Sequence, residues 1–433
     1  MTSPDQNTAS ADFVTAATHY RQRALKSLAY GVSSTPRGNQ RPAPIVADRA
    51  EGAHVFDITG KRFIDYALGY GPLLLGHSPA PVIAAVTAEM QRGLRTASVH
   101  QGEAELAELL AEVVPSAELS AFVSSGSEAI QLALRVARAA TGKTRIVKFR
   151  GNYHGWFDNV HVAGTPGDDG PGTLGQDPGA ASALVLADWG QVEGLEALLD
   201  DSVAGVLLEP AAVNGGCFAP PAGFLETLRE LTAQRGILLI FDEVITGFRM
   251  SLGGAQEVYG VTPDISVIGK AMGAGFPISA VVGSQAAMAV LGSGKLLHRG
   301  TFNGNPISVA ASTACIRHLA ANAGTIYPRM DAQAEEIRAF VRARADDAGV
   351  RLSVSRVGSA LQLFMGLDTL SGLSDVSRID REATIEFTAD LLGQGVQTLP
   401  RGLMYLSAVH ADADIAATKD AFATAIDRRA ARS

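Results

Sequence analysis

Between about residue 120 and residue 318, short apolar runs alternate with segments of helical periodicity. Five of the runs predict strands: 121–123, 145–149, 183–186, 203–208 and 237–241. Three segments with apolar positions three and four residues apart predict helices: 128–140, 192–199 and 221–235. Strands that alternate with helices are typical of a mostly parallel sheet with helices on both faces. We therefore expect an α/β fold with a doubly wound sheet.

The pattern changes after about residue 318. Four apolar side chains at helical spacing predict a long amphipathic helix: Met330, Ala334, Ile337 and Val341. Strands are expected at 352–357 and 361–365, and a last helix is expected near 415–428. This order of elements predicts a smaller α+β domain at the C-terminal end of the chain.

A hairpin signal lies nearer the N-terminus. Two segments with strand composition, 53–57 and 62–66, flank a turn at 58–61 that contains glycine. We expect this hairpin to join the C-terminal domain. The predicted organisation therefore has three parts: an N-terminal segment that joins the small domain (1–70), a large cofactor-binding domain (71–318) and a C-terminal small domain (319–433).

Length and composition bound the class of protein. With 433 residues, 47% apolar and 18% charged, the chain exceeds one ordinary core and has a globular composition. The net charge of -8 and the pI near 5.6 argue against nucleic acid as a partner, because phosphate binding requires a basic face. No apolar run is long enough to span a membrane, and the polar N-terminus, which we expect to be frayed, is not a signal peptide. Cys217 and Cys315 indicate no disulfide framework, so we expect a cytoplasmic protein.

Asp242 and Lys270 are the first candidates for chemistry. Asp242 follows the apolar run 237–241, and Lys270 follows a second apolar run, 265–268. The carboxyl ends of parallel strands border the crevice in which open α/β sheets bind ligands. An acid and a lysine in one crevice suggest a Schiff-base enzyme with an aspartate under a pyridinium nitrogen. Taken singly, each residue also has an ordinary explanation, as a helix cap and as a solvated surface lysine.

Further candidates follow the neighbouring predicted strands. Ser125, Gly126 and Ser127 lie between a strand and a helix, where backbone N–H groups bind a phosphate ester. The same Ser-x-x-Glu spacing is also a plain helix cap. Tyr153 lies between two glycines and is suited to stacking on a flat ring, whereas a buried turn tyrosine is the alternative. His154 is either a catalytic base or a structural histidine.

Three polar residues complete the candidate set. Glu209 follows the predicted strand 203–208, and Asn214 follows it in a loop with two glycines, so both belong to the same crevice. Thr301 lies in a polar, glycine-rich loop before a helix and is another possible phosphate contact. A nicotinamide dehydrogenase is disfavoured, because no Gly-x-Gly-x-x-Gly opens a βαβ unit. We expect no metal ion in the site.

Taken in order, these segments resemble the class III (subgroup II) aminotransferases of PLP fold type I. Within that family the likeness is to the glutamate-1-semialdehyde aminomutase-like branch. Its most specific parts are FDEVITGFR at 241–249, VTPD at 261–264 and Gly269-Lys270. The likeness runs from about Gly31 to near the C-terminus. It implies a large domain with a mostly parallel doubly wound sheet, a smaller α+β domain, and pyridoxal 5'-phosphate (PLP) as cofactor.

The resemblance also implies roles for the candidate residues. Lys270 is similar to the lysine that forms the Schiff base with PLP, and Asp242 to the partner of the pyridine nitrogen. The other implied contacts of the cofactor's phosphate, ring and hydroxyl side are Ser125, Gly126, Ser127, Tyr153, Glu209 and Asn214. Thr301 resembles a phosphate ligand that the family supplies from the neighbouring subunit. The resemblance therefore implies a homodimer.

The substrate side leaves two reactions open. Arg37 lies in a segment that resembles the one holding the substrate carboxylate in the aminomutases. However, the aminomutases carry tryptophan at Tyr70 and a Glu-Ala-Gly-Phe segment near 400–403, where this chain has Arg401. The Pro-Arg-Gly version looks more like β-amino-acid aminotransferases, although Arg401 also suits an ordinary surface position. The prediction is amino transfer between a carboxylate-bearing amine and an oxo acid, with an intramolecular aminomutase as the alternative.

Overall fold

The computed structural model describes residues 6–164 and 169–432. Its large sheet has the strand order β4-β10-β9-β8-β7-β5-β6. The strands are β4 (Leu119–Val123), β5 (Arg145–Phe149), β6 (Leu184–Ala187), β7 (Val203–Leu208), β8 (Leu238–Glu243), β9 (Ile265–Ile268) and β10 (Ser279–Gly283). Neighbours from β6 to β9 are parallel, which confirms the predicted mostly parallel sheet. Strand β10 was not predicted, and its short connection to β9 permits only the antiparallel pairing that is observed.

Helices cover both faces of this sheet because successive side chains along a strand point to opposite faces. Ile240 packs on one face with α4 (Gly126–Thr141) and α8 (Gln285–Gly292). Its neighbour Phe241 packs on the other face with α6 (Phe224–Gln234). Strand β8 therefore contributes to two hydrophobic cores, which explains why its sequence is continuously apolar rather than alternating.

The sequence predicted α4 and α6 correctly but erred at other helices. The helix expected at 192–199 is a single turn, α5 (Leu195–Leu198), which begins after Gly194 with a φ of 77°. The expectation of a frayed N-terminus was wrong from Gln6 onward, because helix α1 spans Gln6–Ala24. Short helix α7 (Gly254–Tyr259) was not predicted. The stretch 164–179, rich in glycine, proline and aspartate, also predicts a long loop, of which residues 165–168 lie outside the described residues.

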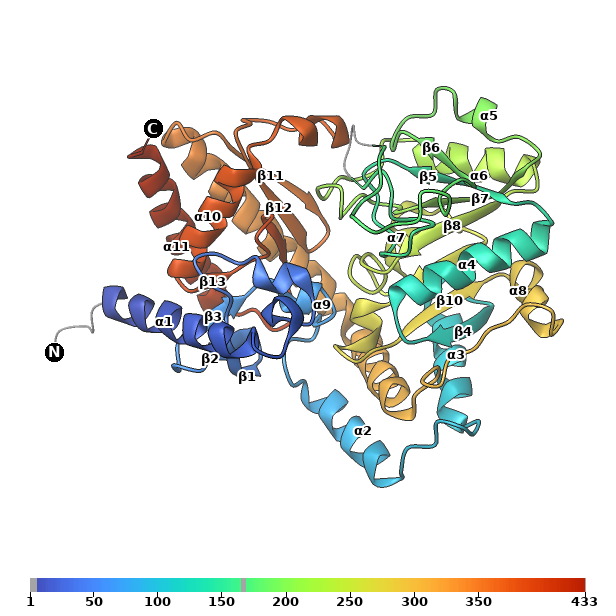
Figure 1. Cartoon of the computed structure of the whole chain (residues 1–433), viewed down its shortest axis with the longest axis horizontal. Helices are drawn as coiled ribbons and strands as arrows, with labels where there is room; N and C mark the ends of the chain where they lie inside the picture. Colours follow the sequence, from blue (N-terminus) through green and yellow to red (C-terminus); the bar gives the residue numbers. More distant parts are fainter. Residues whose placement is uncertain (1–5, 165–168, 433) are drawn as a thin grey trace.

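Helix α9 (Pro306–Asp347) connects the two halves of the molecule (Figure 1). One end of α9 packs with α2 (Ala80–Gln91) and α3 (Gln101–Val113), and its other end packs with the C-terminal elements. The predicted apolar stripe from Met330 to Val341 is buried, as expected. The boundary predicted at residue 318 falls inside this 42-residue helix, and the three domain ranges stay predictions. Within the described chain, we find no helix with the length and apolar character of a membrane span.

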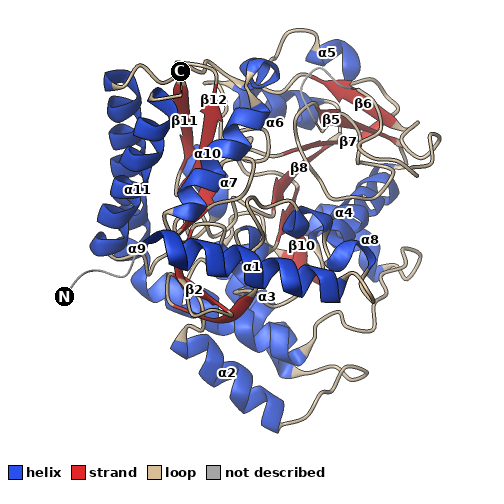
Figure 2. Cartoon of the chain, turned by 60° about the vertical axis from the view of Figure 1, so that its left-hand side comes forward, coloured by secondary structure: helices blue, strands red, loops and turns tan. Residues whose placement is uncertain are grey.

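The smaller half contains a three-stranded antiparallel sheet, β11-β12-β14. Its elements are β11 (Leu352–Val357), β12 (Ala360–Met365), α10 (Arg381–Gly393), β14 (Leu403–Tyr405) and α11 (Asp412–Ala430). The predicted strands and last helix are thus confirmed. Figure 2 shows β11 and β12 standing apart from β5, β7 and β8, with α10 and α11 beside them.

The N-terminal hairpin joins this smaller half, as predicted. Strands β1 (Ala47–Glu51), β2 (His54–Asp57) and β3 (Arg62–Asp65) form an antiparallel ribbon. The C-terminal strand β13 (Val396–Gln397) pairs with β3 in parallel. The blue N-terminal and red C-terminal segments therefore lie side by side in Figure 1.

Arg249 ties three distant segments to the loop after β8. Its side chain is buried, and Nη2 donates to the carbonyl of Gly71 at 2.6 Å. Nη1 donates to the Leu406 carbonyl at 3.0 Å and to Ser359 Oγ at 3.3 Å. The guanidinium also lies 4.7 Å from the centre of the Tyr405 ring. Burial lowers the pKa of Arg249 to about 10, so this group remains charged at neutral pH.

We expect Arg249→Gln to lower the free energy of unfolding by about 3 kcal/mol, because buried carbonyls lose their donors. Urea unfolding measures this change. Arg342→Gln is the matched control, since Arg342 is exposed, and it should change stability by less than about 0.5 kcal/mol. Equal stabilities of the two variants would contradict the proposed role of Arg249 in holding the segments together.

Candidate active site

A cavity of about 320 Å³ lies at the carboxyl ends of β5, β7, β8 and β9. Parallel neighbours end on the same edge of a sheet, so the residues that follow these strands meet there. All predicted cofactor contacts except Thr301 line this cavity: Ser125, Gly126, Ser127, Tyr153, Glu209, Asn214, Asp242 and Lys270. The structure thus brings together residues that are as much as 145 positions apart in the chain (270 − 125).

Asp242 and Lys270 come from adjacent parallel strands. In the register of β8 and β9, Asp242 lies opposite Val267, and Lys270 begins a one-turn 3-10 helix just beyond β9. Lys270 has a φ of 43°, a left-handed conformation that is unfavourable for a side chain of this size and is found at functional sites. Burial is the main cause that lowers the pKa of the Lys270 amine to about 8, against the opposing effect of Asp242. The amine is therefore close to losing its proton near neutral pH.

His154 holds the carboxylate of Asp242. Its Nδ1 lies 2.7 Å from Asp242 Oδ2, and the Val244 N–H donates to Oδ1 at 3.1 Å. A carboxylate can only accept, so Nδ1 carries the proton of this pair. Burial lowers the pKa of His154, which favours a neutral ring. Of the two explanations that the sequence left open for His154, the geometry favours support of Asp242 over action as a base.

The turn at 125–127, which is predicted to bind a phosphate, also caps helix α4. Ser125 Oγ accepts from the Glu128 N–H at 3.3 Å and donates to its carboxylate at 2.9 Å. Gly126 and Ser127 begin α4, so their N–H groups belong to the helix terminus that borders the cavity. Gly155 closes the other side: a Cβ there would lie 2.5 Å from Ser127 Oγ, and its φ is 96°. Only glycine permits this close contact between the two segments, and the candidate anion site beside it is therefore compact.

Glu209 orders the loops on both sides of the cavity. Its carboxylate accepts from the backbone N–H of Tyr153 at 2.9 Å and of Asn214 at 3.1 Å. It also accepts from Asn214 Nδ2 at 3.2 Å. Burial is the main cause that raises the pKa of Glu209 to about 7, and the nearby Asp242 carboxylate adds to it. Glu209 therefore changes charge close to physiological pH.

Two contributors were missed by the sequence reasoning. Lys148 is fully buried on β5, and its Nζ lies 2.9, 3.0 and 3.3 Å from the carbonyls of Val162, Asn152 and Phe149. Three acceptors match the three protons of an ammonium group, so Lys148 clamps the loop that carries Tyr153. Its only sequence signal is a lysine inside an apolar strand. Trp156, 67% exposed, lines the cavity and follows the same loop.

The three predicted substrate residues do not line the cavity but lie near one another. Arg401 Nη1 donates to the Asn214 carbonyl at 2.9 Å, and Nη2 lies 3.2 Å from Asn214 Oδ1. Tyr70 is half-buried, which raises its pKa, while the charges of Arg37 and Arg401 act to lower it. Arg37 and Arg401 are therefore each within electrostatic reach of Tyr70. Thr301 is exposed and lies outside the Lys270 cavity.

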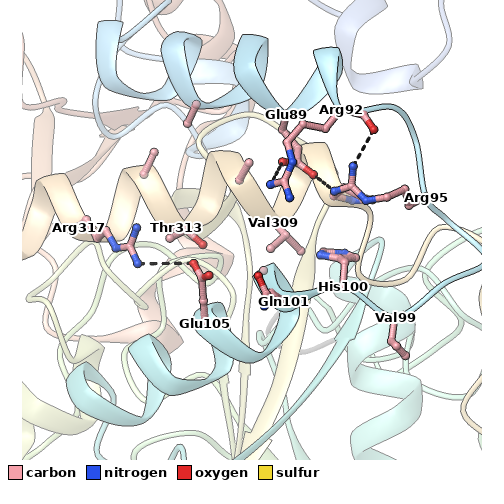
Figure 3. Close-up of a pocket in the computed structure, with 15 residues that line it drawn as sticks. Glu89, Arg92, Arg95, Val99, His100, Gln101, Glu105, Val309, Thr313 and Arg317 are labelled. Carbon is pink, nitrogen blue, oxygen red and sulfur yellow. Dashed lines mark hydrogen bonds and ion pairs between the residues drawn. The ribbon is translucent and has the colours of Figure 1, made fainter.

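A separate cavity of about 440 Å³ lies between α2, α3 and α9 (Figure 3). Figure 3 shows Arg92 and Arg95 beside Glu89, and Arg317 beside Glu105. Each of these arginines is paired with a glutamate, and neither the lysine nor the acid of the first cavity lines this one. The chemistry-bearing residues therefore point to the Lys270 cavity as the candidate active site.

The Lys270 cavity fits PLP by the chemistry of its groups. It combines a helix N-terminus for the phosphate, Tyr153 for the ring, a carboxylate for the ring nitrogen and an amine for the aldehyde. The sequence matches the family model described as aminotransferase class-III over residues 35–426. The chain belongs to this family. Its cofactor is PLP, as in the family and in a transaminase solved with PLP bound.

Class III relatives of two kinds are similar to this chain. The glutamate-1-semialdehyde 2,1-aminomutase of Rhodopirellula baltica is 39% identical over 87% of this chain and 87% of its own. An omega-transaminase from Sphaerobacter thermophilus has a TM-score of 0.88 and 33% identity, covering 96% of this chain and 98% of its own. A β-phenylalanine aminotransferase from Variovorax paradoxus has a TM-score of 0.87 and 28% identity, covering 99% of each chain. These matches show the fold and the PLP-dependent class, which includes both transaminases and aminomutases.

The raised pKa of Glu209 predicts a pH-dependent stability in the cofactor-free protein. The carboxyl group titrates near 4.5 when unfolded and near 7 when folded, so folding favours its protonated form. Its contribution to stability is full below about pH 4.5 and is lost as pH rises through about 7. The free energy of unfolding of wild type, relative to Glu209→Gln, should therefore fall by about 2.5 kcal/mol between about pH 5 and about pH 8. Urea unfolding at both pH values measures it.

Glu226→Gln provides the control for this titration, because Glu226 is exposed on α6. Its stability relative to wild type should not change with pH. A constant difference between wild type and Glu209→Gln would contradict the burial argument.

Proposed function

We propose that this class III enzyme transfers an amino group between a carboxylate-bearing amine, such as a β-amino acid, and an oxo acid. The single observation that supports transfer is the environment of Arg401. Among the described residues, its guanidinium bonds only to neutral oxygens of Asn214, at the rim of the cavity. Its charge is therefore available for a substrate carboxylate, and a planar guanidinium binds that group bidentately.

Each residue around Lys270 has a defined task in this reaction. Bound PLP supplies an electron sink for the bond that breaks at the substrate carbon. The neutral amine of Lys270 accepts the proton from that carbon and returns a proton to the product. The Asp242 carboxylate, held by His154, would stabilise positive charge on the ring nitrogen of bound PLP. Arg401 and Arg37 orient the substrate through its carboxylate.

An intramolecular aminomutase is the second candidate function, and the sequence relatives favour it. Further curated relatives, 34–38% identical to this chain, are also named glutamate-1-semialdehyde 2,1-aminomutases. The substrate side argues the other way, because the aminomutases that the chain resembles carry an acidic segment where Arg401 stands. The structural neighbours include an omega-transaminase and a β-phenylalanine aminotransferase.

Substrate screening separates the two reactions. We expect the PLP-loaded protein to convert an amino donor to one equivalent of oxo product and to bleach its visible cofactor band, with recovery on addition of pyruvate or 2-oxoglutarate. We also expect Arg401→Gln to raise the KM for carboxylate substrates by about tenfold or more, because a charged bidentate contact is lost. Arg342→Gln serves as the exposed-arginine control. Conversion of glutamate-1-semialdehyde to 5-aminolevulinate without a co-substrate would establish the aminomutase instead.

A homodimer is part of this proposal. Thr301 lies outside the cavity of its own chain, beside Phe302, which is 64% exposed. Val99 is 94% exposed, and His100 next to it hydrogen-bonds the Gly304 carbonyl at 2.7 Å, which joins the two exposed segments. Adjacent exposed apolar side chains are typical of a protein interface. We propose that a second copy covers this face and receives Thr301 near its phosphate site.

Mixed dimers test the action of Thr301 on the partner's site. Lys270→Ala and Thr301→Glu should each be inactive, the second because a carboxylate would repel the phosphate. A hybrid of the two contains one site with both intact residues, so co-refolding them in equal amounts should restore roughly a quarter of wild-type activity. Two Lys270→Ala preparations that carry different tags, refolded together, control for refolding. No recovery in verified hybrids would place Thr301 outside the partner's site.

A further inference from the structure

A second cavity adjoins the candidate active site. It has a volume of about 270 Å³ and lies among the loop after β7, strand β12, a 3-10 helix (Leu373–Arg378) and the start of α10. Asn214 lines both this cavity and the Lys270 cavity, and Arg401, which bonds to Asn214, lines the second one. The two cavities therefore meet at Asn214, and Arg401 lies on the side of the second cavity.

The second cavity carries positive charge without compensation. Arg381 and Arg401 line it, and no aspartate or glutamate does. Across the described parts of the chain, neither guanidinium forms an ion pair with a carboxylate. Asp380, the acid next to Arg381, caps α10 by accepting from the Ala383 N–H at 2.9 Å. Two guanidinium groups in a concave site attract an anion, and they bind a carboxylate in a fixed geometry.

The rest of the lining is suited to a carbon chain. Phe364, Val376, Ile379 and Ile385 supply an apolar wall. Gly216 also lines the cavity. A Cβ at this position would lie 2.8 Å from Phe364, so the bare backbone of Gly216 forms this part of the cavity wall. An apolar wall with cations suits a ligand that has methylene groups and an anionic end. A small inorganic anion would leave the apolar wall unused.

We propose that this cavity is a distal substrate subsite for dicarboxylic amines and oxo acids. In this arrangement Arg401 binds the carboxylate nearer the reacting carbon, the methylene chain lies along the apolar wall, and Arg381 binds the far carboxylate. The proposal rests on the proposed amino transfer and names its substrate class. It requires the exposed side chain of Arg401, which is held by two hydrogen bonds to the Asn214 carbonyl and amide oxygens, to admit the chain between the cavities.

The test compares Arg381→Gln and Arg381→Lys with Arg378→Gln in the PLP-loaded protein. Arg378 is the matched control, because it is exposed on the neighbouring 3-10 helix, pairs with Asp375 and does not line the cavity. For each protein, kcat/KM is measured with pyruvate and with a series of dicarboxylic oxo acids of increasing length. Arg381→Gln should lower the ratio of dicarboxylate to pyruvate kcat/KM at least about tenfold, with partial recovery in Arg381→Lys. Arg378→Gln should leave the ratio unchanged. An unchanged ratio in Arg381→Gln would overturn the subsite.

Calorimetric titration of suberate, a saturated dicarboxylate, separates this inference from the proposed function because it requires no turnover. If suberate binding depends on Arg381 but the protein transfers no amino group, the subsite is supported and the proposed function is rejected. Binding that does not depend on Arg381 would reject the subsite alone. Titration with inorganic phosphate is the comparison, and Arg381-dependent phosphate binding that suberate fails to displace would show a free-anion site, contrary to the proposal.

Discussion

The burial of charge at the carboxyl ends of parallel strands is the constraint on which the rest of this structure depends. The Asp242 and Glu209 carboxylates line one small cavity, and Lys148 is buried beside it, where a charge is not stable without close partners. The partners are specific: His154 and a backbone N–H for Asp242, three donors for Glu209 and three carbonyls for Lys148. These contacts fix the loops around the cavity, so the hydrogen bonds that stabilise the buried charges also position the candidate reactive groups.

The two halves of the molecule contribute different functions to the site. The large sheet supplies the lysine, the acid and the anion turn, which belong to the chemistry common to the family. The smaller half supplies Arg401 and Arg381, to which the proposed function assigns substrate choice. Helix α9 and the buried Arg249 connect these halves, so the position of the substrate arginines relative to Lys270 depends on packing far from the cavity.

The proposed choice between transfer and rearrangement rests on few residues. The class III relatives share the cofactor and the fold whether they are named transaminases or aminomutases. In the proposed function, the charge of Arg401 sets which groups the substrate side can bind, whereas Lys270 and Asp242 act at the cofactor. The curated relatives at 34–39% identity are aminomutases, whereas the structural neighbours include an omega-transaminase at 33% identity, so overall identity does not separate the two reactions.

The sequence by itself determined the α/β class, the N-terminal hairpin and the candidates Asp242 and Lys270, because apolar periodicity and strand-end position are local patterns. It did not predict β10, and it placed a domain boundary at residue 318, inside helix α9. Strand pairing and helix length depend on neighbours that are remote in the chain. His154 was left open and Lys148 was missed, since only folding shows which carboxylate or carbonyls a buried polar group meets. The tertiary structure alone brought Arg401 to Asn214 from a position 187 residues away, and with that contact decided where an uncompensated cation meets the active site.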